Sequence, residues 1–286
     1  MKSFLNKKLI SYFIKIIIGL GLYLYLFLQN KINFDFFQYK NSFLLIQLFA
    51  LQVFMLAIGT LRWHRIGVYA FGMKISLLTT AYISWIGQFF STFLPSTVGA
   101  DLSRIYYVSK KINMPKKKLL KITIMDRLTA LLTVITWSAL GLVFYFKGFN
   151  LFMSVSSILT VLALLRLLPK RKLKQILFKK DIKLPPFSVV ILSLFIFLLK
   201  ALSLFLIIYL VRDKGGINDY YLCLGSQFIE GLRILPANIG MGHILFDKAL
   251  GLIENINGAQ IYNIYFTVKI LFKVTGLVGW LFIRTN

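Results

Sequence analysis

The chain has 286 residues, of which 58% are hydrophobic and 15% are charged, and its formal net charge is +25. A soluble domain carries about 25% charged residues, so these numbers exclude an ordinary soluble globular protein. Basic residues collect in the cytoplasmic loops of membrane proteins, which explains the charge without nucleic-acid binding. One cysteine and two histidines leave no recognisable zinc site, and we expect neither a metal nor another cofactor.

Six apolar segments have the length of helices that cross about 30 Å of hydrocarbon. In chain order they are 9–28, 42–61, 122–146, 149–168, 187–211 and 260–283. The first is too long for the apolar core of a signal peptide, and no cleavage site follows it. Two further apolar segments, 77–94 and 219–235, are shorter, and each ends in Leu-Pro followed by glycines.

The distribution of lysine and arginine indicates how the two short segments run. Segments 95–121 and 169–186 each hold seven basic residues, and such segments stay in the cytoplasm. If the N-terminus is inside, segment 62–76, with three basic residues, is inside as well. Segment 95–121 then stays inside only if 77–94 enters the membrane and turns back, and the same reasoning makes 219–235 a hairpin from the outer side. We therefore predict an all-α integral membrane protein with six spanning helices, two re-entrant helical hairpins, and cytoplasmic N and C termini.

The predicted topology contains an internal repeat within a single transmembrane domain, 1–286. The sequence LPSTVGAD at 94–101 resembles LPANIGMG at 235–242, at an offset of 141 residues. The offset relates repeat 1, about 42–146, to repeat 2, about 187–283, and the two would have opposite orientations, as in many transporters. The basic cytoplasmic loop 169–186 lies between them. A chance match of two short motifs is the alternative.

The residues expected at the two hairpin turns are prolines and glycines. Proline ends a helix because its ring clashes with the preceding turn, and glycine permits a sharp reversal. The predicted turn residues are Pro95, Gly99, Pro236, Gly240 and Gly242. The glycines could instead serve only to let helices pack closely.

Charged residues within apolar segments are costly and need a partner or a polar cavity. On the cytoplasmic side, Arg62, Arg104 and Arg127 are candidates for binding phosphate, since a guanidinium forms a bidentate fork. Towards the other side the candidates are Arg233, Lys269 and Lys273, and Lys200 is expected to lie between the two groups. The acids expected to organise all these cations are Asp101, Asp126 and Glu230. The alternatives are a structural cluster of ion pairs and the ordinary basic belt of a membrane protein.

No motif of a known enzyme class stands out. The sequence has no G-x-S-x-G, no Walker loop, and no glycine-rich dinucleotide motif in a suitable context. An intramembrane transferase that uses Asp101 or Asp126 as a base remains an alternative.

The first motif region extends from Arg62-Trp63 through IGQFFSTFLPSTVGADLSR at 86–104 to Asp126-Arg127. Together with Leu235-Pro236 to Gly242, it resembles the flippase-like transmembrane family named for the membrane region of lysylphosphatidylglycerol synthase, the multiple peptide resistance factor. The resemblance covers nearly the whole chain and implies a lipid-handling membrane protein. It does not extend to the soluble aminoacyltransferase domain, so lysyl transfer is not implied. Leu245 stands where the family commonly has glutamate.

We therefore expect a flippase-like protein of the cytoplasmic (inner) membrane that binds and moves a phosphate-bearing lipid. The lipid would be a phospholipid or a polyprenyl-phosphate-linked glycolipid, and enzymes of cell-envelope or glycan synthesis are candidate partners. The first alternative is an integral membrane enzyme, or its subunit, in glycolipid or envelope biosynthesis. The second is a scaffold that does not transport.

Overall fold

The computed structural model describes residues 21, 24–25, 27–30, 42–93, 98–145, 186–212, 215–231, 241–254 and 257–283. Over these ranges the chain forms eight defined helices and no strand. The all-helical class predicted from the sequence is therefore confirmed for this part of the chain.

The first four helices occupy the segment from residue 42 to residue 145. They are α2 (Ser42–Phe71), α3 (Leu77–Phe93), α4 (Val98–Ile112) and α5 (Lys116–Tyr145). Gly72 follows α2 with a φ of +64°, the left-handed conformation that commonly ends a helix. The Ser76 hydroxyl then accepts a hydrogen bond from the Thr79 backbone N–H at 3.2 Å, which caps the start of α3.

The last four helices repeat this order of long, short, short and long. They are α8 (Phe187–Arg212), α9 (Ile217–Gly231), α10 (Met241–Glu254) and α11 (Gly258–Ile283). Asn257 caps α11 because its side-chain oxygen accepts a hydrogen bond from the Gln260 N–H at 3.0 Å. The Asp219 carboxylate similarly accepts one from the Gly216 N–H at 2.8 Å, at the start of α9.

Four of these helices are long and apolar enough to cross a membrane: Phe43–Phe71, Lys116–Tyr145, Phe187–Arg212 and Gly258–Leu281. They match four of the spans predicted from hydropathy, 42–61, 122–146, 187–211 and 260–283. The predicted spans 9–28 and 149–168 lie outside the described residues, except for isolated helical positions between 21 and 28. The basic loop 169–186 also lies outside them, except for Pro186.

The helix that begins at Ser42 is longer than its apolar segment predicts. The predicted span ends at residue 61, but α2 continues to Phe71, so Arg62 and Arg65 both lie inside the helix. Its 30 residues extend about 45 Å, which exceeds the thickness of the hydrocarbon core. One face of its last turns is packed in the protein: Trp63 and Ile66 are fully buried against α5 and its neighbours.

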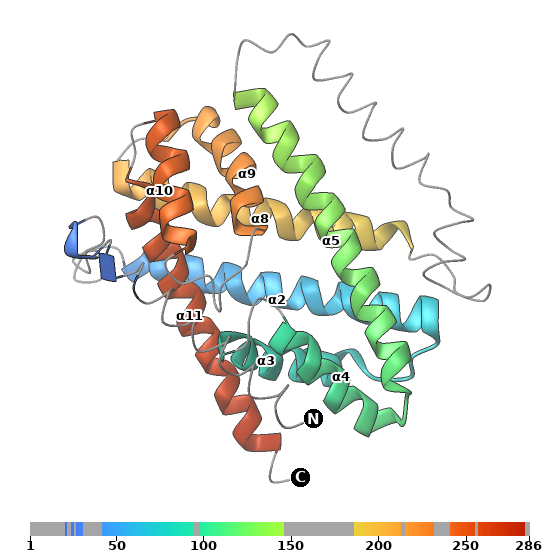
Figure 1. Ribbon diagram of the computed structural model, residues 1–286. Helices are drawn as coiled ribbons and strands as arrows, with labels where there is room; N and C mark the ends of the chain where they lie inside the picture. The colour runs from blue at the N-terminus through green and yellow to red at the C-terminus, as the bar shows by residue number, and fades with distance from the viewer. Residues whose placement is uncertain are drawn as a thin grey trace, which may run out of the picture.

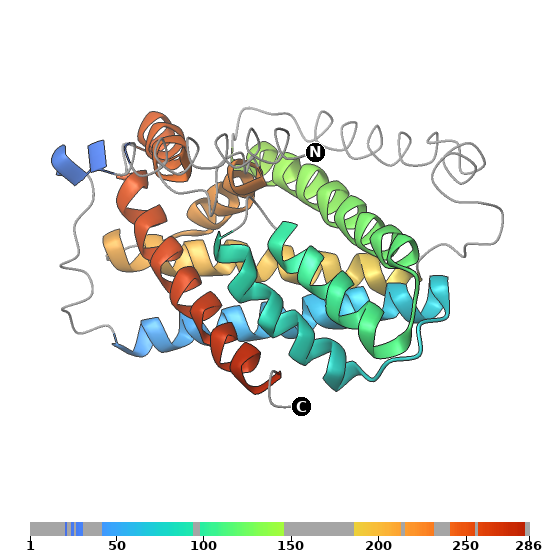
Figure 2. The ribbon, with the colours of Figure 1, turned by 60° about the horizontal axis from the view of Figure 1, so that its bottom comes forward.

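Two antiparallel helices, α2 and α8, form the centre of the fold (Figure 1). The long helices α5 and α11 each contact both of them. The short helix α3 packs against α11, and the short helix α9 packs against α5. Figure 2 shows the same pairs from another direction. Each long outer helix is therefore attached to a short helix from the other half of the chain.

The offset of 141 residues found in the motifs also relates the helix bounds. It carries Phe71 to position 212, where α8 ends, and Leu77 to position 218, next to the start of α9 at 217. It carries Lys116 to position 257, next to the start of α11 at 258. The same offset relates α3 to α9 and α5 to α11, so the contact of α5 with α9 corresponds to the contact of α11 with α3.

Two of the predicted turn glycines lie inside helices. Gly99 is in the first turns of α4, and a Cβ there would overlap the backbone of Phe90 in α3. Gly242 is in α10, where a Cβ would overlap the Tyr262 ring of α11. Both glycines therefore allow close helix packing, which was the alternative interpretation of the sequence. The predicted turn residues Pro95, Pro236 and Gly240 lie outside the described residues.

Candidate functional site

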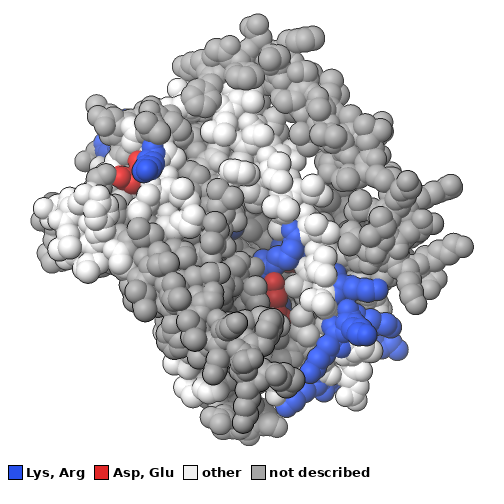
Figure 3. Space-filling model, in the orientation of Figure 1, with Lys and Arg blue, Asp and Glu red and all other residues white. Residues whose placement is uncertain are grey.

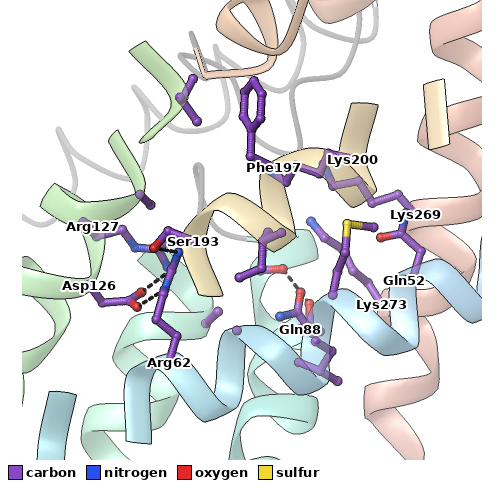
Figure 4. Close-up of a pocket in the computed structure, with 18 of the residues that line it drawn as sticks. Gln52, Arg62, Gln88, Asp126, Arg127, Ser193, Phe197, Lys200, Lys269 and Lys273 are labelled. Atoms are coloured by element: carbon purple, nitrogen blue, oxygen red, sulfur yellow. Dashed lines mark hydrogen bonds and ion pairs between the residues drawn. The ribbon is translucent and has the colours of Figure 1, made fainter. Parts of the chain in front are cut away.

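A cavity of about 210 Å³ lies where six helices meet. Its lining comes from α2, α3, α4, α5, α8 and α11. The basic residues in the described lining are Arg62, Arg104, Arg127, Lys200, Lys269 and Lys273. Figure 4 shows labelled side chains from both halves of the chain converging on it, so residues far apart in sequence share one polar space.

Arg62 of α2 is bound to Asp126 of α5 by two hydrogen bonds. Its Nε donates to Oδ1 at 2.7 Å and its Nη2 donates to Oδ2 at 3.0 Å. Its Nη1 also donates to the Ser193 hydroxyl of α8 at 3.1 Å. Asp126 is only 2% exposed. The pair therefore joins three helices, and removing one member would leave a buried charge uncompensated.

A second bidentate pair connects α5 to the start of α4. The guanidinium of Arg127 donates to Asp101, from Nε to Oδ2 at 2.9 Å and from Nη2 to Oδ1 at 2.6 Å. Asp101 lies in the first turn of α4, where a negative charge is stabilised by the helix dipole. This contact orients Arg127 at the edge of the cavity.

Arg104 is the buried arginine with the most hydrogen-bonding capacity left over. It is 6% exposed, and its Nε donates to the Ser84 hydroxyl at 3.1 Å. Its nearest acid among the described residues is Asp101, at 3.8 Å from Nη1, which is beyond hydrogen-bond length. Both oxygens of Asp101 are already bound by Arg127. The terminal nitrogens of Arg104 are therefore available to an anion in the cavity.

The lysines lie at the other end of the cavity, where α8 and α11 approach (Figure 4). Lys200 comes from α8, and Lys269 and Lys273 are four residues apart on α11, one turn of helix. The Lys269 ammonium lies 5.0 Å from the centre of the Tyr265 ring, within the range of a cation–π interaction. Lys273 is 7% exposed.

The charge of the cavity is strongly positive. In the part of its lining that the structure describes, six side chains are basic and one, Asp126, is acidic. That carboxylate is bound to Arg62. Figure 3 shows basic and acidic atoms in the hollow at the centre of the visible face. A low-dielectric cavity of one sign attracts ligands of the opposite sign, so this site suits an anion.

A separate group of lysines lies on the surface beside the cavity. It covers the end of α4 and the start of α5 and consists of Lys110, Lys111, Lys116, Lys117 and Lys118, all exposed. Basic residues are gathered at the edge of the molecule in Figure 3. They do not line the cavity, and their position at helix ends is typical of residues that meet anionic lipid headgroups.

The structure brings together six of the seven cations predicted as headgroup ligands. Arg233, the seventh, lies outside the described residues, and so does the side chain of Glu230. The three arginines line the same cavity as Lys269 and Lys273, which the sequence assigned to the opposite side, and as Lys200, which it placed between the two groups.

Sequence reasoning missed the uncharged polar residues of the site. Ser84 accepts a hydrogen bond from Arg104, and Ser193 accepts one from Arg62. Gln52 and Gln88 line the cavity. Amides within otherwise apolar segments were a usable signal for Gln52 and Gln88. Serines are frequent in membrane helices, so nothing local distinguished Ser84 or Ser193.

Comparison with known proteins gives one match. The family model described as the lysylphosphatidylglycerol synthase TM region matches residues 12–271. No curated protein and no solved structure matches the chain. The match covers most of the chain, including all of α2, α3, α4, α5 and α8 and the part of α11 up to residue 271. The chain therefore belongs to the family of the lysylphosphatidylglycerol synthase transmembrane region, and it is a multi-pass membrane protein.

Proposed function

We propose that this protein binds the phosphate-bearing headgroup of a lipid in the central cavity and passes it between the leaflets of the cytoplasmic membrane. The observation that supports this most directly is the buried guanidinium of Arg104, which lines the cavity with its terminal nitrogens available. Guanidinium groups bind phosphate through pairs of parallel hydrogen bonds. Apolar chains can stay in the surrounding lipid while the headgroup crosses.

The topology in this proposal has six spanning helices and two re-entrant hairpins, with both termini in the cytoplasm. Its support is the length of the short helices, which have 17, 15, 15 and 14 residues in α3, α4, α9 and α10. They extend about 21–26 Å, less than the roughly 30 Å of a hydrocarbon core. Each pair would enter and leave on one side, and the shared offset of the helix bounds supports an inverted repeat within one transmembrane domain.

Lipid handling depends on the cavity being accessible to headgroups and closed to chains. The basic side chains of the cavity would attract an anionic headgroup. The neutral amides of Gln52 and Gln88 offer both donors and acceptors to its polar linker. A headgroup held in this way exchanges water for protein hydrogen bonds. That exchange lowers the barrier to crossing apolar lipid, where an isolated charge is costly.

The decisive experiment measures movement of fluorescent phospholipid analogues in vesicles that contain the purified protein. We expect Arg104→Ala and Lys273→Met each to reduce the rate at least tenfold, because each removes a cation from the cavity. Arg65→Ala is the matched control, since Arg65 lies on the same helix as Arg62 but is exposed and does not line the cavity. Size-exclusion profiles establish that each variant folds. Unchanged rates in both cavity variants would contradict the proposal.

The enzyme alternative is less well supported by the geometry. A base needs a carboxylate oxygen that can reach substrate. Both oxygens of Asp126 bind Arg62, and both oxygens of Asp101 bind Arg127. These carboxylates are arranged to hold arginines. Formation of a new product from labelled lipid by the purified protein would nevertheless favour the enzyme. Partnership with enzymes of envelope or glycan synthesis is part of the proposal and is tested by co-purification.

A further inference from the structure

We infer that the lipid headgroup carries two anionic groups, one bound at the arginine end of the cavity and the other at the lysine end. The arginine end consists of Arg62, Arg104 and Arg127, and the lysine end of Lys200, Lys269 and Lys273. This inference rests on the proposed function and adds the chemistry of the ligand.

The spacing follows from α8, which forms one wall of the cavity. Ser193 of this helix accepts a hydrogen bond from Arg62 and so marks the arginine end. Lys200 lies seven residues further along the same helix, which corresponds to about 10.5 Å along its axis. Figure 4 shows Arg62, Arg127 and Ser193 on one side of Phe197 and the labelled lysines on the other. The two groups of cations therefore approach the cavity from opposite sides of Phe197, and each offers its own place for an anion.

The two ends also differ in chemistry. The arginine end presents planar guanidinium groups, which match the paired oxygens of a phosphate. The lysine end presents ammonium groups, which bind an anion as point charges without a fixed fork. In the described lining the acid belongs to the arginine end, where Asp126 binds Arg62. Each end is therefore built to interact with negative charge by itself.

The space between the ends contains neutral polar groups. Gln88 of α3 lies between the ends, and Gln52 of α2 lies next to the lysines (Figure 4). A side-chain amide can donate to and accept from hydroxyl groups. The ligand that fits all three regions has two phosphates, or a phosphate and a carboxylate, joined by a short hydroxylated linker. The same chemistry could come from a lipid or from a free water-soluble bisphosphate.

The test compares two lipids that share the glycerol linker and differ in the number of phosphates. Native mass spectrometry of the purified full chain measures its affinity for cardiolipin, which has two phosphates, and for phosphatidylglycerol, which has one. We expect the wild-type protein to bind cardiolipin at least tenfold more tightly. In Lys273→Met this preference should fall to less than threefold, with phosphatidylglycerol binding nearly unchanged. Arg104→Ala should weaken the binding of both lipids.

The control for a general loss of charge is Lys111→Met, because Lys111 is exposed at the end of α4 and does not line the cavity. It should keep the full preference for cardiolipin. Equal affinity of the wild-type protein for the two lipids, or an unchanged preference in Lys273→Met, would overturn the inference. The proposed function would survive that result if Arg104→Ala still abolished lipid binding and transport.

A water-soluble competitor separates the two possible sources of the ligand. The deacylated headgroup of cardiolipin presents the same two phosphates without chains. We expect it to displace cardiolipin only at a concentration at least a hundredfold above that of the lipid. Displacement at equal concentration would overturn the assignment of the ligand to a lipid. Absence of binding by either lipid would overturn the proposed function itself.

Discussion

Arg62 and Asp126, 64 positions apart in sequence, face each other across α2 and α5 with both carboxylate oxygens bound to one guanidinium, at 2.7 and 3.0 Å. The pair is buried and lies directly beside Trp63, which is fully buried in the apolar cluster between these helices. Packing thus fixes the position of the charges. The energetic role of the pair can be separated from its role in binding.

A single substitution at this pair should destabilise the protein more than the double substitution. Arg62→Met leaves Asp126 buried without its counter-ion, and we expect the free energy of unfolding to fall by about 3–5 kcal/mol. In Arg62→Met/Asp126→Leu both charges are absent, and most of that loss should be recovered. Denaturant titration in detergent micelles measures both variants. A double variant as unstable as the single one would contradict this account.

The crossing of α3 and α4 should not tolerate a side chain at Gly99. In Gly99→Val the added carbon atoms overlap the backbone of Phe90, which cannot move without shifting the helix. We expect a lower thermal midpoint and a loss of monodisperse protein on size exclusion. The control is Gly59→Ala, whose Cβ would meet only Ile196 at 3.8 Å, an ordinary contact. Its thermal midpoint should be unchanged or slightly higher.

Ser84 should increase lipid affinity by orienting the guanidinium of Arg104. Ser84→Ala removes the acceptor for the Arg104 Nε, so the guanidinium is less well oriented. A hydrogen bond to a charged group contributes about 1.5–3 kcal/mol, which corresponds to a loss of roughly 10- to 150-fold in lipid affinity. Ser84→Thr keeps a hydroxyl and should recover part of the affinity. If Ser84→Ala lowered only the thermal midpoint and left lipid affinity unchanged, Ser84 would have a purely structural role.

The side on which each loop lies can be measured by cysteine labelling. The chain has one cysteine, Cys223, which is buried, so Cys223→Ala provides a background without reactive thiols. In that background Lys74→Cys and Lys117→Cys should react with a membrane-impermeant maleimide only from the cytoplasmic side. Ile217→Cys should react only from the outer side. Reaction of Lys74→Cys and Lys117→Cys from opposite sides would contradict the re-entrant topology.

The sequence predicted those parts of the fold that depend on local apolar content. The ends of α8 and α11 lie within two residues of the predicted spans, because an apolar helix must extend through the hydrocarbon whatever it packs against. The predicted end of α2 was wrong because Arg62, just beyond it, is bound by Asp126, which lies 64 residues away in sequence. No window of local hydropathy contains that information.

The candidate site was predicted in composition but not in geometry. Intramembrane charges such as Lys273 and Asp126 stood out because their burial needs an explanation. The sequence predicted cations from both sides along one headgroup path, but not which helices meet there: the contacts of α2 with α8 and α11 bring the arginines and lysines to one cavity. Gly99 and Gly242 were expected at turns, because glycine has the same local signature in a turn and at a close helix crossing.

The two halves share an order of helices, but their second short helices, α4 and α10, pack against different neighbours. In the first half α4 packs mainly on its neighbour α3, whereas in the second half α10 packs mainly on α11 and only slightly on α9. Among the described residues, α10 is therefore held chiefly by the last long helix, whereas α4 is held chiefly by the short helix before it. A substitution at the face that α10 presents to α11 should accordingly disturb the second half more than the matching change on α4 disturbs the first.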